Sequence, residues 1–172
     1  MMRKIAWMGM MLLCAGMLSA RAADWAQGKF GTSLVDAKGK TVETAKALKG
    51  VELIGIYFSA HWCPPCRQFT PMLVKFYNEC KKDKKSFQIV FVSFDNTEKD
   101  MSKYMTEANM PWLAVPYGSD FREKLAKEYN VSGIPMLIVI DKNGKVVSTG
   151  ARGEVTSKGA KAYDGWKSKA AK

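Results

Sequence analysis

The stretch that most constrains the fold is the apolar run VELIGIYFS at residues 51–59, because polar and apolar side chains do not alternate along it. β-Branched and aromatic residues dominate the run, which favours a strand, and a strand without alternation is buried on both faces. Such a strand lies at the centre of a sheet that other elements cover on both sides. The sequence therefore predicts an α/β protein built around residues 51–59.

A helix is predicted to follow directly, over residues 66–80. Its apolar residues recur at intervals of three and four positions and form one stripe: Phe69, Met72, Leu73, Phe76, Tyr77 and Cys80. Polar side chains such as Lys75 and Asn78 occupy the other side. Pro71 lies inside the helix, where a proline is expected to produce a kink.

The later segments alternate between strand and helix patterns. The predicted elements are strands at 87–94 and 136–140, helices at 97–108 and 119–129, a hairpin at 34–42, and a second hairpin in which 145–149 pairs with the last strand. From residue 158 onward, alanine, lysine and glycine predict a poorly ordered basic tail, 158–172, with Tyr163 and Trp166 as the residues that could attach it to the domain. This order implies a mixed sheet with helices on both faces.

Residues 1–22 have the pattern of a signal peptide. Arg3 and Lys4 precede an apolar run at 5–18, and small residues surround a cleavage point at 20–22. The run is shorter than the roughly 20 residues that a membrane-spanning helix needs. We therefore expect an exported protein, periplasmic or secreted, with one domain after residue 22.

The chain is basic, with a formal net charge of +11. Much of this charge lies in the run at residues 81–85, KKDKK, and in the C-terminal lysines. Such runs usually form solvated surface, although they also attract acidic partners. No nucleic-acid motif accompanies the charge, so we predict no nucleic-acid partner.

The chain also carries two cysteines, Cys63 and Cys66, that are separated only by Pro64 and Pro65. A purely structural disulfide is a poor explanation, because so short a loop contributes only about 2 kcal/mol. A metal site would need His61 and Cys80 as further ligands. In a helix over 66–80, however, Cys66 and Cys80 lie about 21 Å apart. We therefore predict no metal site.

A redox pair fits this position best. A cysteine where a buried strand meets a helix N-terminus faces unpaired N–H groups and the positive end of the helix dipole, and both favour the thiolate. Lowering the thiol pKa from about 8.5 to about 7 ionises about half of the thiol at neutral pH. Pro64 and Pro65 stiffen the first turn. We expect Cys63 to be the nucleophile and Cys66 the resolving cysteine.

The motifs FSAHWCPPCR, FVSFDNTEKDM, MPWLAVPY, VSGIPMLIVIDKNGKV and ARG resemble the tryparedoxin and nucleoredoxin branch of the thioredoxin superfamily. The resemblance implies a thioredoxin fold, with a thioredoxin-like domain at 23–157, and thiol–disulfide exchange. It also implies that Trp62 lies beside the sulfurs. Ile134–Pro135 would be a cis peptide bond that presents the backbone of Ile134 to an extended substrate.

One position departs from typical thioredoxins. Six residues before Cys63, where they carry a buried aspartate that accepts a proton, this chain has Tyr57. Tryparedoxin-like proteins are similar to it there. The route by which the buried thiol loses its proton is therefore an open question at this point.

Together these features predict an exported thiol–disulfide oxidoreductase that reduces disulfides of proteins or small thiols through Cys63 and Cys66. We expect a monomer that needs no metal or organic cofactor beyond this disulfide and that is recharged by an unidentified electron donor. Two alternatives stay open. The protein could instead form or isomerise disulfides, or it could be a non-catalytic module that binds peptides between Trp62 and Ile134–Pro135.

Overall fold

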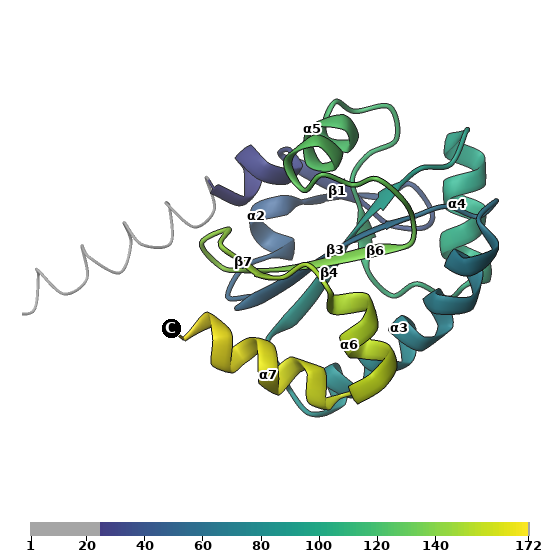
Figure 1. Ribbon diagram of the computed structural model, residues 1–172. Helices are drawn as coiled ribbons and strands as arrows, with labels where there is room; N and C mark the ends of the chain where they lie inside the picture. The colour runs from purple at the N-terminus through teal and green to yellow at the C-terminus, as the bar shows by residue number, and fades with distance from the viewer. Residues whose placement is uncertain (1–24, 172) are drawn as a thin grey trace, which may run out of the picture.

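The computed structural model describes residues 25–171 and is built around one mixed sheet of seven strands. The strand order is β2-β1-β5-β4-β3-β6-β7 (Figure 1). The strands are β1 (Ser33–Val35), β2 (Thr41–Glu43), β3 (Leu53–Ser59), β4 (Phe87–Ser93), β5 (Leu113–Ala114), β6 (Met136–Asp141) and β7 (Val146–Ser148).

β3 is the central strand that the apolar run predicts. It pairs in parallel with β4 on one side and antiparallel with β6 on the other, and all seven of its residues are buried. Leu53 and Tyr57 point into one apolar cluster, whereas Ile54, Ile56 and Phe58 point into the other. The lack of alternation thus reflects burial on both faces of the sheet.

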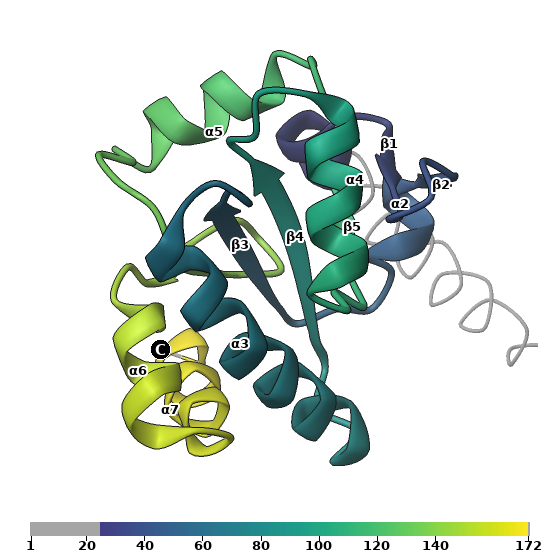
Figure 2. The ribbon, with the colours of Figure 1, turned by 90° about the vertical axis from the view of Figure 1, so that its right-hand side faces the viewer.

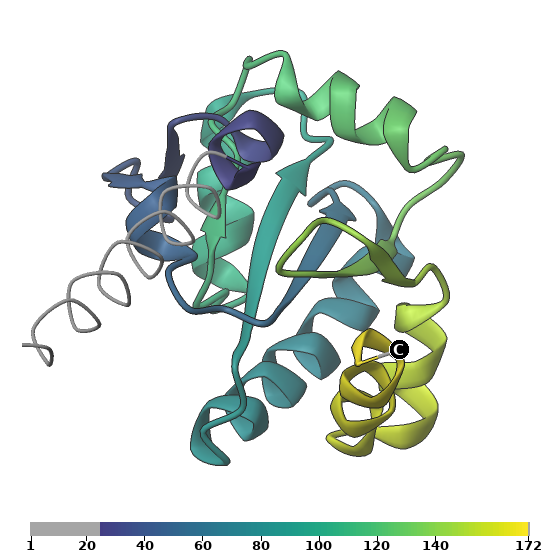
Figure 3. The same ribbon diagram turned by 90° about the vertical axis from the view of Figure 1, so that its left-hand side faces the viewer.

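Helices cover both faces, which confirms the predicted α/β architecture. They are α2 (Thr44–Ala47), α3 (Pro64–Lys82), α4 (Glu98–Glu107), α5 (Phe121–Glu128), α6 (Ala151–Lys158) and α7 (Lys161–Ala170), and residues 25–30 are helical as well. α3, α4, α6 and α7 pack on one face (Figure 2), and α2, α5 and the helical residues 25–30 on the other (Figure 3). In residues 25–171, none of the helices is both long and apolar enough to cross a membrane.

The longest helix, α3, brings the cysteine pair to the end of the sheet. Its buried residues follow the predicted stripe, including Phe69, Leu73 and Phe76, but Met72 of that stripe is 42% exposed; the helix continues through Pro71. Cys63 is its N-cap residue. α3 therefore begins where β3 ends, next to the carboxyl end of β4 (Figure 2).

The C-terminal segment is a helix, so the expectation of a poorly ordered tail from residue 158 is wrong. α7 buries Ala162, Tyr163 and Trp166 against the sheet face that also carries α3. The indole N–H of Trp166 donates a hydrogen bond to Glu154 of α6, whose carboxylate also accepts from Ser148. The lysines of α7 lie on the solvent side of the helix, which explains why the composition of this segment resembles that of a solvated tail.

Candidate active site

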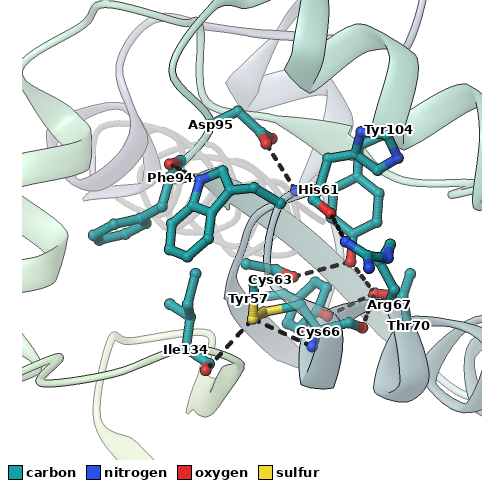
Figure 4. Close-up of a disulfide and its surroundings, with 12 residues drawn as sticks. Tyr57, His61, Cys63, Cys66, Arg67, Thr70, Phe94, Asp95, Tyr104 and Ile134 are labelled. Carbon is teal, nitrogen blue, oxygen red and sulfur yellow. Dashed lines mark hydrogen bonds between the residues drawn. A yellow bond between two sulfur atoms is a disulfide. The ribbon is translucent and has the colours of Figure 1, made fainter.

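The structure joins Cys63 and Cys66 in a disulfide at the start of α3 (Figure 4). Their Cα atoms are 5.2 Å apart, within the range of ordinary disulfides. Pro64 and Pro65 form the first helical turn, where a missing N–H costs nothing. Cys63 keeps 4% of its surface exposed and Cys66 none. Cys63 is therefore the more accessible of the two cysteines.

The backbone around Cys63 favours a negative charge on its sulfur. The N–H of Cys66 points at Sγ of Cys63 over 3.3 Å, so the side chain of Cys63 caps the helix. Because this N–H group and the helix dipole both favour an anion, the reduced Cys63 is held where its thiolate is stabilised. The structure thus supplies the electrostatic setting that the sequence predicts for a nucleophilic cysteine.

The Ile134–Pro135 peptide bond is cis, which confirms the expectation from the resemblance. It places the carbonyl oxygen of Ile134 3.7 Å from Sγ of Cys63. Ile134 also packs against the small apolar cluster that contains both cysteines. A loop distant in sequence therefore lies directly against the disulfide, with its backbone beside the reactive sulfur.

Trp62 lies at the edge of this site and is 56% exposed, which is unusual for so large an apolar side chain. Its indole N–H donates a 3.0 Å hydrogen bond to the carbonyl of Phe94, just after β4. Phe94 packs against the same cluster as the cysteines. Trp62 is therefore held in place while its ring stays open to solvent.

Tyr57 lies beneath the disulfide in a buried network of hydroxyl groups (Figure 4). Thr70 gives its single proton to the carbonyl of Cys66, so its oxygen accepts from the hydroxyls of Tyr57, at 2.7 Å, and Tyr104. Ser59 in turn bonds to Tyr104 at 3.1 Å. Burial, and next the nearby Tyr104, raise the pKa of Tyr57 above its usual value. Tyr57 consequently stays neutral at physiological pH and is no proton acceptor.

We expect Tyr57→Phe to leave the pH dependence of turnover unchanged between about pH 6 and 9, because the phenol does not titrate there. Thr70 loses one of its donors, so the free energy of unfolding should fall by about 1 kcal/mol. pH–rate profiles and urea unfolding measure the two effects. Tyr117→Phe, which removes a surface hydrogen bond to Asn96, is the matched control. A shifted profile in Tyr57→Phe would show that this hydroxyl takes part in proton transfer.

Asp95, Tyr104 and Glu107 also border the site, and they are not apparent from the sequence. Asp95 is buried just beyond β4, where it accepts hydrogen bonds from the backbone N–H of His61 at 2.7 Å and from the hydroxyl of Ser93 at 2.8 Å. The ring of His61 stacks on Tyr104, and its Nε2 lies 3.1 Å from a carboxylate oxygen of Glu107. Asp95 follows β4, which is parallel to β3, and functional residues often lie at the carboxyl ends of such strands. This position is the one sequence signal that could have indicated Asp95.

No metal site emerges from the part of the chain that the structure describes. Within residues 25–171, no three His, Cys, Asp or Glu side chains gather as metal ligands. Cys80, the other cysteine of these residues, is buried on the same helix four turns beyond Cys66. Burial raises the pKa of its thiol to about 12, so Cys80 is an unreactive core residue.

Residues 50–146 match the family model described as thioredoxin-like. This chain belongs to the thioredoxin-like family. Bovine (Bos taurus) nucleoredoxin is 44% identical over 123 residues, 71% of this chain and 27% of the relative. The crystal structure of a thioredoxin from Wuchereria bancrofti is 45% identical with a TM-score of 0.70, covering 76% of this chain and 89% of that one.

Native tryparedoxin I from Crithidia fasciculata is 42% identical, with a TM-score of 0.66 and coverage of 75% of this chain and 87% of that one. The family member described here therefore lies in the tryparedoxin and nucleoredoxin branch. Nucleoredoxins and tryparedoxins are thiol–disulfide oxidoreductases, and this chain is a thioredoxin-like redox protein with a Cys-x-x-Cys pair. The chain spans about a quarter of the length of the bovine relative that it matches.

The expectation of an exported protein, periplasmic or secreted, is wrong. The curated relatives are nucleoredoxins, which are cytoplasmic or nuclear proteins. The signal peptide predicted at residues 1–22 lies outside the described residues. The charge and apolar pattern of that segment is the feature that led to the prediction.

Proposed function

We propose that this protein reduces disulfides of proteins or small thiols through the dithiol of Cys63 and Cys66. The observation that carries the proposal is the capping position of Cys63, whose sulfur faces the N–H of Cys66 at the start of α3 while Cys66 stays buried behind it. A stabilised thiolate in contact with solvent and a shielded partner thiol are the two groups that sequential thiol–disulfide exchange requires.

In the first step the Cys63 thiolate attacks one sulfur of the substrate disulfide, and the other substrate sulfur leaves as a thiolate. Cys66 then gives its proton to the thiolate released in the first step and attacks the sulfur of Cys63. The second substrate thiolate leaves, and the Cys63–Cys66 disulfide that the structure contains remains. An external dithiol donor then returns two electrons to this disulfide. The proposed cycle uses no metal and no organic cofactor.

Trp62 and the Ile134–Pro135 backbone provide the proposed substrate-binding surface. They flank the disulfide, and an extended segment can pair with the exposed backbone of this loop. A structure of the related tryparedoxin II is described as a complex with glutathionylspermidine, a small thiol. We propose that a monomer acts on such thiols or on protein disulfides.

Cys66→Ser tests the proposal directly, because without the thiol of Cys66 the second exchange step cannot release the substrate from Cys63. We expect this variant to accumulate a mixed disulfide between Cys63 and a model protein such as insulin, detected by mass spectrometry. The wild type should instead release reduced insulin chains with dithiothreitol as donor. Titration against glutathione gives the direction. We expect a potential between about −270 and −200 mV, and one near about −120 mV would indicate a disulfide-forming oxidase.

A further inference from the structure

Three arginines from three different helices contact residues that lie near the cysteine pair. Arg67 of α3 donates a hydrogen bond to the backbone carbonyl of His61. The guanidinium carbon of Arg122 in α5 lies 6.0 Å from the ring centroid of Phe94. That of Arg152 in α6 lies 6.0 Å from the ring centroid of Phe69. Each guanidinium group is therefore held by a residue that neighbours the cysteine pair.

The residues that the three arginines contact, His61, Phe94 and Phe69, all lie near the cysteine pair. His61 is two residues before Cys63, and Figure 4 shows the Arg67 side chain reaching the carbonyl of His61. Phe94 packs against the apolar cluster that contains both cysteines, and its carbonyl accepts the hydrogen bond from Trp62. Phe69 is buried in α3 one turn beyond Cys66. The positive charges thus border the surface on which a substrate docks.

Few carboxylates offset these charges. Within residues 25–171, neither Arg67 nor Arg152 forms a salt bridge, whereas Arg122 pairs with its exposed neighbour Glu123. Asp95 is buried and already bonded. Glu107 is paired with His61 and Lys103. A surface of this kind attracts negative charge, and guanidinium groups match the geometry of carboxylates.

We propose that the arginine rim, Arg67, Arg122 and Arg152, selects protein disulfides that are flanked by acidic residues. This inference rests on the proposed reductase function and adds its substrate class. Arg122 is the specificity residue of the rim. Its guanidinium group lies over the ring of Phe94, whose carbonyl accepts the hydrogen bond from Trp62, so Arg122 borders the docking surface. It lies on α5 and is not part of the N-terminus of α3, which stabilises the Cys63 thiolate. Carboxylates beside the substrate cystine pair with the rim when the disulfide reaches Cys63.

The test compares two disulfide peptides of equal length whose cystine is flanked by glutamates in one and by lysines in the other. With the wild type, we expect kcat/KM to favour the acidic peptide about tenfold near 20 mM salt. Because salt screens charges that lie apart, the preference should fall to about twofold near 0.5 M. The ratio of the two rates is independent of the thiolate content of Cys63, since the same sulfur attacks both peptides.

Variants of Arg122 separate this inference from the proposed function. Arg122→Ala should reduce the acidic preference about threefold, Arg122→Glu should reduce it further, and Arg122→Lys should retain most of it. Lys142→Ala, in the turn after β6 at the opposite end of β3, is the matched control and should keep the wild-type ratio. Equal rates for both peptides with the wild type, or a preference that Arg122→Glu leaves intact, would overturn the inference. If neither peptide is reduced, the proposed function itself fails.

Discussion

Replacement of Cys63 by serine is expected to slow catalysed insulin reduction by at least about a thousandfold, to the rate of dithiothreitol alone. A serine hydroxyl does not ionise near neutral pH and cannot form the mixed disulfide. Serine can still occupy the N-cap position of α3, and the loop stays the same. It provides no thiolate, however, for the N–H of Cys66 to stabilise. Turbidity of the released insulin chains measures the effect.

Cys80→Ala is the control for this experiment, because Cys80 is buried in a different apolar cluster from Cys63 and Cys66. It should retain the wild-type rate at a temperature where both variants are folded. Equal rates for wild type and Cys63→Ser would contradict catalysis. They would favour a module that binds peptides between Trp62 and Ile134 without reducing them.

Replacement of Trp166 by alanine is expected to lower the free energy of unfolding by about 3–5 kcal/mol. Trp166 is 1% exposed, and its ring meets those of Phe76 and Phe87 at centroid distances of 5.4 and 5.8 Å. The substitution removes this ring from the core and leaves the carboxylate of Glu154 without its indole donor. Urea unfolding followed by circular dichroism measures the change.

Trp62→Ala is the matched control, since it removes a tryptophan whose ring is mostly exposed. It should change the free energy of unfolding by less than about 1 kcal/mol while weakening substrate binding. If Trp166→Ala were as stable as Trp62→Ala, α7 would contribute nothing to the core, and the segment after residue 158 would behave as the tail that its composition suggests.

The sheet and the cysteine pair could be predicted from the sequence because their signals are local. The apolar run at 51–59 has no alternation, the stripe from Phe69 to Cys80 has helical spacing, and CPPC places two sulfurs within bonding reach. The helix predicted at 97–108 is α4, and its cap is local too, because the hydroxyl of Thr97 accepts from the N–H of Asp100. Each of these features depends on residues that are close together in the chain.

The remaining parts depend on contacts between distant segments. Tyr104 reaches Thr70 from α4, and Arg122 reaches Phe94 from α5, across 34 and 28 positions of sequence. The helix α7 was missed for a different reason. Its apolar residues, Ala162, Tyr163 and Trp166, are few, and lysines and alanines around them hide the stripe. Only the packing against α3 and the sheet reveals which side of that helix is buried.

The anchoring of the segment before Cys63 has a consequence for how the protein changes between its two redox states. Asp95 holds the N–H of His61, Arg67 holds its carbonyl, and Glu107 meets its ring, so three elements fix one residue. With the backbone secured in this way, opening the bridge requires little more than rotation of the two sulfur-bearing side chains. In the proposed cycle we therefore expect the oxidised and reduced forms to share nearly the same backbone around Cys63.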